Sequence, residues 1–224
     1  MMQISEDHEF VMKLNQPFAK AVEALRRDAL SHPDYDPAQL FAWGQMMAVS
    51  LLEMLKAVEA RFGREGQQTC TDALVDVGRR LALEGLDGVE VPEGVSPIEA
   101  ISRFATWVNE QLYASVETPS VDGPDACSFD ILWCPHQDVY GPFDCRVQRY
   151  LVEGLIRGAR EKLGDAFGAF DVACDSTMPA GAPTCHFRMW RPKKNEANAW
   201  TAYSRTLEEK ALTRRHGAEQ PGPE

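Results

Sequence analysis

The chain has 224 residues, enough for one large domain or two small ones whose core needs no disulfide or structural metal. Its formal net charge of -11 excludes nucleic acid as an expected partner, because phosphate binding requires a basic face. Hydrophobic residues make up 44% and charged residues 25%, so we expect a packed globular core rather than a disordered chain.

Nothing in the sequence directs the chain to a membrane. The first residues, MMQISEDHEFVMK, contain acids and lack the apolar core of a secretory signal. The longest apolar stretch, residues 40–52, is too short to cross a bilayer. We therefore expect a cytoplasmic protein without a membrane partner, whose six cysteines are thiols, metal ligands or buried apolar residues rather than disulfides.

The first half of the chain predicts helices. Apolar residues recur at helical spacing in the segments 6–30, 36–63, 67–84 and 96–112. The last of these begins with Ser96-Pro97-Ile98-Glu99, which is typical of a capping box. Trp43, Met46, Met47 and Trp107 suit an apolar pocket or a plain core, and we favour the core.

The second half predicts a small sheet. Two prolines and one glycine within residues 116–125 indicate a boundary, after which residues 127–134 alternate as a strand does. A helix over 147–163, strands over 170–174 and 184–190, and a tail helix over 200–215 follow.

These elements predict an α+β fold: an N-terminal bundle of about four helices, then a small α/β subdomain with a short, mostly antiparallel sheet. The expected divisions are 1–120 (helical), 121–192 (α/β, with a cysteine cluster) and 193–224 (a partly helical tail).

Candidate chemistry gathers at the strand ends and in the loop between them. The candidate catalytic residues are Cys134, Cys145, Cys185, His136 and Asp138. A thiolate can act as a nucleophile while a histidine handles protons and Asp138 orients a substrate amine.

Metal binding and a purely structural role are the alternatives for the same cysteines. Cys134, Cys145, Cys185 and His186 could hold zinc or another transition metal, although their spacing matches no zinc finger. Free cysteines also serve as small buried apolar residues, which is the reading we favour for Cys70 and Cys174.

The strand patterns predict which faces these side chains occupy. Alternation places Cys134 on the side of Asp130, opposite Trp133, and places His186 on the side of Arg188 and Trp190.

Cys134-Pro135, Cys145 at the start of a helix, and Thr184-Cys185-His186-Phe187-Arg188 together resemble the L-2-amino-thiazoline-4-carboxylic acid hydrolase-like family. More distantly, the layout is similar to 4-vinyl reductase domains, which look like small-ligand-binding modules. The resemblance implies a hydrolase of a cyclic amidine-like thiazoline, opened to an N-carbamoyl cysteine, with Cys134, Cys145 and Cys185 as the matching residues. The sequence departs from the family pattern in a short loop between Cys134 and Cys145 and in Arg146 after the second cysteine.

Two functions remain open at this stage. The first is a hydrolase-like protein acting on a small cyclic C–N substrate such as a thiazoline carboxylate. The second is a non-catalytic sensor module that binds a metal or a small ligand, with the helical half forming a homodimer.

Overall fold

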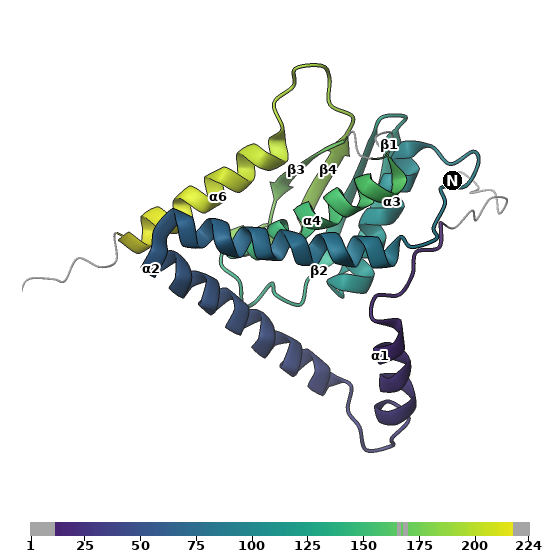
Figure 1. Ribbon diagram of the computed structural model, residues 1–224, viewed down its shortest axis with the longest axis horizontal. Coiled ribbons are helices and arrows are strands. Elements are labelled where there is room, and N and C mark those ends of the chain that lie inside the picture. The colour runs from purple at the N-terminus through teal and green to yellow at the C-terminus, as the bar shows by residue number, and fades with distance from the viewer. Residues whose placement is uncertain (1–11, 165–166, 168–169, 217–224) are drawn as a thin grey trace, which may run out of the picture.

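The structure of this chain is a computed structural model that describes residues 12–164, 167 and 170–216 (Figure 1). Its helices are α1 (Ala19–Ala24), α2 (Ala38–Gly85), α3 (Pro97–Trp107), α4 (Arg146–Leu163) and α6 (Ala199–His216). Short π-helical or 3-10 turns are η1 (Leu25–Ala29), η2 (Val108–Leu112) and η3 (Met178–Ala180). The strands are β1 (Val116–Gly123), β2 (Ala126–Trp133), β3 (Asp171–Ser176) and β4 (Cys185–Trp190).

The α+β class is confirmed. The four strands form one antiparallel sheet in the order β1-β2-β4-β3. Figure 1 shows α4 lying across the sheet with the second half of α2 alongside it, while α6 reaches the β3 edge. The main apolar core lies between the sheet, α3 and α4. No described helix is long and apolar enough to cross a membrane.

Residues 116–125, predicted as a boundary, instead contain an edge strand. β1 pairs along its length with β2, from Val116 opposite Trp133 to Gly123 opposite Ala126. Pro119 indicated a boundary rather than a strand, because a proline is not tolerated in a central strand. An edge strand does tolerate it. β1 therefore continues the sheet across residue 120, where the domain division was predicted.

The predicted helices 36–63 and 67–84 form the two halves of α2. They meet at Gly63, whose φ of 57° and ψ of -138° break the helix at a single residue. Glycine adopts a positive φ without the steric penalty of a Cβ. In Figure 1 the two halves diverge sharply from this point.

The helix predicted over residues 6–30 is shorter in the structure. Its residues 6–11 lie outside the described residues, and residues 12–17 are not helical. In this segment Met12 is buried, and the Asn15 backbone N–H donates to the Gly85 carbonyl at 2.8 Å. These contacts hold the segment against the end of α2 in a non-helical conformation. The helix itself occupies α1 and η1.

The expected bundle of about four helices is not confirmed. The first half of α2 projects from the body, so Trp43, Met46 and Met47 are exposed rather than part of the core. Helical periodicity identifies an apolar face but does not reveal whether the same chain covers that face. By contrast, the Ser96 capping box is confirmed, since Ser96 and Glu99 bind each other's backbone N–H groups.

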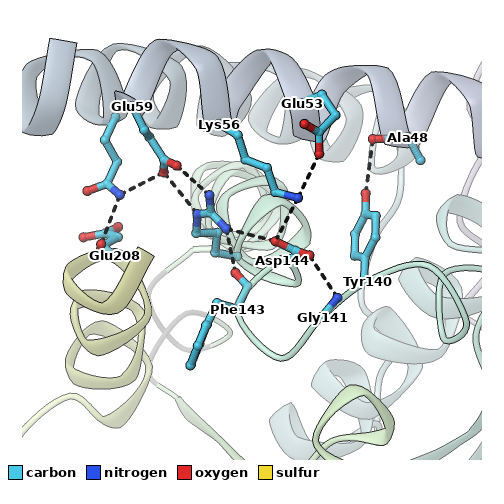
Figure 2. Close-up of polar contacts among 11 residues, drawn as sticks. Ala48, Glu53, Lys56, Glu59, Tyr140, Gly141, Phe143, Asp144 and Glu208 are labelled. Atoms are coloured by element: carbon cyan, nitrogen blue, oxygen red, sulfur yellow. Dashed lines mark hydrogen bonds and ion pairs between the residues drawn. The ribbon is translucent and has the colours of Figure 1, made fainter. Parts of the chain in front are cut away.

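A buried ion pair joins α2 to α4. Arg146 donates to both carboxylate oxygens of Glu59, at 3.1 and 2.6 Å, and both side chains are almost fully buried. Gln67 bridges Glu59 to the Glu208 carbonyl on α6, at 2.9 and 3.3 Å, and Arg146 also donates to the Phe143 carbonyl (Figure 2). This network fastens three helices to one charged centre.

Glycines allow α2 and α4 to approach closely. A Cβ on Gly154 would lie 2.0 Å from the Val75 carbonyl oxygen, and one on Gly78 would lie 2.0 Å from the Leu151 carbonyl oxygen. Neither neighbour can move independently, because each oxygen belongs to a helix backbone.

Gly154→Ala should therefore lower the free energy of unfolding by about 2 kcal/mol or more, through forced separation of the two helices. The control is Gly44→Ala, where nothing lies within 4 Å of the added Cβ. Gly44→Ala should stabilise the chain by up to about 1 kcal/mol, since alanine is the better helix former. Urea denaturation measures both, and equal effects would contradict the packing argument.

Removing one partner of the buried pair should cost more than removing one partner of an exposed pair. Glu59→Gln should destabilise by about 3 kcal/mol, because it leaves the Arg146 charge poorly compensated in the interior. Glu161→Gln is the matched control: Arg79 and Glu161 make the same two-bonded contact between α2 and α4, but in solvent. Its cost should stay below about 1 kcal/mol by the same denaturation measurement.

Candidate functional site

An apolar cavity of about 170 Å³ lies between the sheet, α3, α4 and α6. Four cysteines line it: Cys134, Cys145, Cys174 and Cys185. The structure thus brings together the three predicted cysteines and adds Cys174, which the sequence assigned to the core. A larger groove of about 1060 Å³ lies between the N-terminal segment, α3 and β1, and none of these cysteines lines it.

The end of β2 turns Cys134 into the cavity. Phe129 and Ile131 face the cavity from the strand, and the alternation stops after Trp133. The following turn is closed by the Gln137 N–H donating to the Cys134 carbonyl, while the Gln137 side chain accepts from the Cys134 N–H, both at 3.1 Å. The prediction that Cys134 shares the side of Asp130 is therefore wrong, because Cys134 lies beyond the strand.

Hydrogen-bond donors surround the Cys134 sulfur. The backbone N–H groups of His136 and Gln137 and the hydroxyl of Ser115 all favour its thiolate. Burial acts more strongly in the opposite direction, so the pKa of the Cys134 thiol lies above its ordinary value. Cys134 is thus a neutral thiol at rest, near three groups that favour its anion.

The other thiols in the cavity are also held in the neutral form. Burial raises the pKa of Cys145 and of Cys174 to about 12, and neighbouring thiols add to the shift for Cys145. Burial also raises the pKa of Cys185, whose sulfur accepts a hydrogen bond from the Met178 N–H at 3.2 Å. These three thiols form an apolar, uncharged wall.

Arg149 is the single cation among the residues that line the cavity, and the sequence reading missed it. Its side chain is only 6% exposed, yet it makes no ion pair with any carboxylate in the described part of the chain. It donates to Ser204 at 3.1 Å and to the Trp200 carbonyl at 2.9 Å, and its guanidinium carbon lies 3.7 Å from the Trp200 ring centroid. Burial lowers the pKa of Arg149 to about 10, so it remains charged at neutral pH.

Two further polar atoms near Arg149 are unsatisfied. Gln148 Oε1 and Trp200 Nε1 are buried without a hydrogen-bond partner among the described residues, and both residues line the cavity. A buried polar atom normally has a partner, because leaving it unpaired costs about 1–3 kcal/mol. A cation, a donor and an acceptor therefore lie without full compensation around one small apolar space.

His136 is held at the edge of the cavity by α2. Its ring stacks on Tyr140 with centroids 4.8 Å apart, and its Nδ1 lies 3.4 Å from Gln45 Oε1. Gln45 also donates to the Pro135 carbonyl. Burial lowers the pKa of His136, so the imidazole is neutral at pH 7.

Asp138 and His186 do not belong to the cavity. Asp138 is exposed in the loop after Cys134, contrary to its predicted role beside a substrate amine. His186 lies on the opposite face of β4 from Cys185, as its predicted neighbours Arg188 and Trp190 required, and its Nδ1 lies 3.2 Å from Asp130. Cys185 and His186 therefore cannot bind one metal ion together.

Among the described residues, no three His, Cys, Asp or Glu side chains are arranged to hold a metal ion. The described thiols and the imidazole that line the cavity are therefore not arranged as the zinc or other transition-metal site predicted from the sequence requires.

A signal for Arg149 was present in the sequence. Cys145, Arg149, Val152 and Ile156 are spaced by four, three and four residues, so they share one face of α4, and all four line the cavity. An arginine in such an apolar stripe indicates a buried cation. The helix over 147–163 was instead predicted from the apolar residues that begin at Val147, and Val147 packs toward α2.

The burial of Cys145 predicts a pH dependence of stability. Its pKa is raised from 9.0 to about 12, so the folded state binds this proton more tightly than the unfolded state does. The resulting stability is complete below pH 9 and decreases as the pH rises toward 12, by at most about 1.4 kcal/mol per pH unit.

Cys145→Ala should therefore flatten the fall of the free energy of unfolding above pH 9, measured by urea denaturation at several pH values. Cys70→Ala is the control, because its thiol is less buried and its pKa is raised by less. Equal slopes for the two variants would contradict a strongly raised pKa at Cys145.

Comparison with known proteins gives one relative. An uncharacterized protein of Archaeoglobus fulgidus is 44% identical over 199 residues, covering 88% of this chain and 88% of its own length. No family model matches the chain, and no solved structure matches it.

Proposed function

The chain belongs to one family with this Archaeoglobus fulgidus protein, and we propose that it is a hydrolase-like protein acting on a small cyclic C–N substrate that carries a carboxylate. The observation that carries the proposal is the uncompensated Arg149 in a cavity lined by thiols. The cavity volume of about 170 Å³ favours a small metabolite, because pockets that bind drug-sized ligands have volumes of about 300 Å³ or more.

Arg149 binds the substrate carboxylate in this proposal. A guanidinium matches a carboxylate through two parallel hydrogen bonds, and the low-dielectric surroundings strengthen the interaction. The Trp200 N–H is a second donor available to the ligand, and Gln148 Oε1 can accept from an amine. A thiazoline carboxylate, the substrate class implied by the sequence resemblance, carries all of these groups.

Cys134 is the proposed nucleophile. Its sulfur attacks the amidine carbon, and its proton passes to the ring sulfur, which leaves as a thiol while an isothiourea forms on Cys134. Water then adds to that carbon and releases Cys134 with its proton restored. The net reaction consumes one water and yields the N-carbamoyl product, so the ring bond that breaks is C–S, while the C–N bonds of the amidine carbon remain. Ser115, His136 and Gln137 favour the negatively charged form of the Cys134 sulfur, which develops when the thiol loses its proton and again when the sulfur leaves the carbon.

A non-catalytic ligand-binding module is the second candidate. Its support is the neutral state of the thiols and the imidazole: the pKa values of all four thiols are raised and that of His136 is lowered. A resting site without a thiolate or an imidazolium suits a binding protein as well as a hydrolase.

The test uses 2-amino-thiazoline-4-carboxylate, with binding followed by calorimetry and product by chromatography. Arg149→Met should weaken binding by about tenfold or more, because a charge-assisted hydrogen bond contributes about 1.5–3 kcal/mol. Arg157→Met, an exposed position on the same helix, should bind as the wild type does. Cys134→Ser should bind normally and form at least about a hundredfold less product, whereas Cys70→Ser should be unaffected.

The outcomes separate the two candidates. Wild-type binding that depends on Arg149 without any product would support the ligand-binding module and reject the hydrolase. Absence of binding, or binding unchanged by Arg149→Met, would reject the carboxylate site.

A further inference from the structure

The first half of α2 presents an apolar stripe that no other part of the described chain covers. Residues 38–52 contain no charged side chain, and yet much of this segment faces solvent in Figure 1. Large exposed residues of the first half of α2 include Trp43 and Met54, each 60% exposed, and Phe62, 57% exposed. The remaining large exposed side chains on this face are Leu40, Met46 and Met47.

The spacing of this stripe is that of a helix-pairing seam. Residues 40, 43, 47, 50, 54, 57 and 61 follow intervals of three and four, and the first five of them are Leu40, Trp43, Met47, Ser50 and Met54. A repeat of this kind places one row of side chains along a helix for packing against a second helix. The inner face of the same segment is already occupied by the chain itself, through Leu52, Leu55 and Glu59.

We propose that this stripe pairs with the same stripe of a second copy of the chain, forming an antiparallel homodimer. The six large side chains, about half exposed and with roughly 200 Å² each, offer on the order of 600 Å² per chain. Two copies then bury on the order of 1,200 Å², which reaches the lower limit of stable, specific interfaces.

Charge favours a second copy and an antiparallel arrangement. Each chain carries a formal charge of -11, so two copies approach best where residues 38–52 carry no ionisable group. Each body packs on the inner face of its helix, so pairing through the outer face keeps the two acidic bodies on opposite sides of the helix pair. Antiparallel pairing also sets the positive N-terminal end of one helix toward the negative C-terminal end of the other. A membrane surface is the weaker candidate, since interfacial helices are rich in Lys and Arg, and residues 38–62 contain only Lys56 and Arg61.

Sedimentation equilibrium of the purified chain tests the proposal. The wild type should have twice the 25.0 kDa mass of one chain at micromolar concentration, and Trp43→Glu/Met54→Glu should have the mass of one chain. Val121→Glu is the matched control, since Val121 is 51% exposed on the edge strand β1, and it should remain dimeric. A monomeric wild type, or dissociation by Val121→Glu alone, would overturn the proposal.

Cross-linking tests the geometry without disturbing the fold. In an antiparallel pair centred on the seam, Ser50 meets Ser50 of the other copy, so Ser50→Cys should give a disulfide-linked dimer under mild oxidation. Ala60→Cys, exposed on the same helix but off the seam, should link at least about tenfold more slowly. Equal rates would contradict the seam. The membrane alternative predicts a different result: the wild type is monomeric and sediments with vesicles that contain anionic lipid, and Trp43→Glu/Met54→Glu abolishes this binding. That outcome would replace the dimer with a membrane site.

Discussion

The contact between Glu59 and Arg146 is the constraint on which the rest of the structure depends. Both charges lie in the interior, where each would be strongly destabilising without the other. Their pairing fixes the start of α4 against the middle of α2, and Gln67 extends the same polar centre to α6. A buried ion pair of this kind adds little net stability over apolar residues, but it permits only one relative placement of the helices. The glycines that bring α2 and α4 together then set their separation.

This placement determines the cavity, because α4 has two buried faces. One face, with Arg146, Tyr150 and Gly154, packs against α2. The other face, with Cys145, Arg149 and Val152, lies over the sheet. Rotating α4 by a single residue would move Arg149 out of the cavity and Arg146 away from Glu59 together. The ion pair therefore also positions the uncompensated cation of the candidate site.

Much of the fold could be predicted from local sequence patterns, and the failures have identifiable causes. The Ser96 capping box, α4 and the strands β2, β3 and β4 depend on signals within a few residues, and all lie close to their predicted positions. β1 was missed because its proline is acceptable only at a sheet edge, which is a property of the assembled sheet. Cys134, Cys145, Cys185 and His136 were chosen by residue type and all line the cavity, whereas Asp138, chosen to orient a substrate amine, does not. Arg149 was missed because an arginine is usually exposed, and only its position among apolar residues of one helix face indicates burial.

The first half of α2 connects the candidate site to the apolar stripe on its outer face. Gln45, on the inner side of this helix, contacts Pro135 and His136 in the turn that directs Cys134 into the cavity. The helix also contributes Leu52 and Leu55 to a second apolar cluster with Tyr140 and Tyr150, so its inner side is fixed to the body while its outer side is not. A helix held on one side only is less protected against local opening than one packed on both sides. Covering the outer stripe of α2 would thus also hold Gln45 in place. The geometry around the Cys134 sulfur would then depend on this stripe, although the sulfur makes no contact with it.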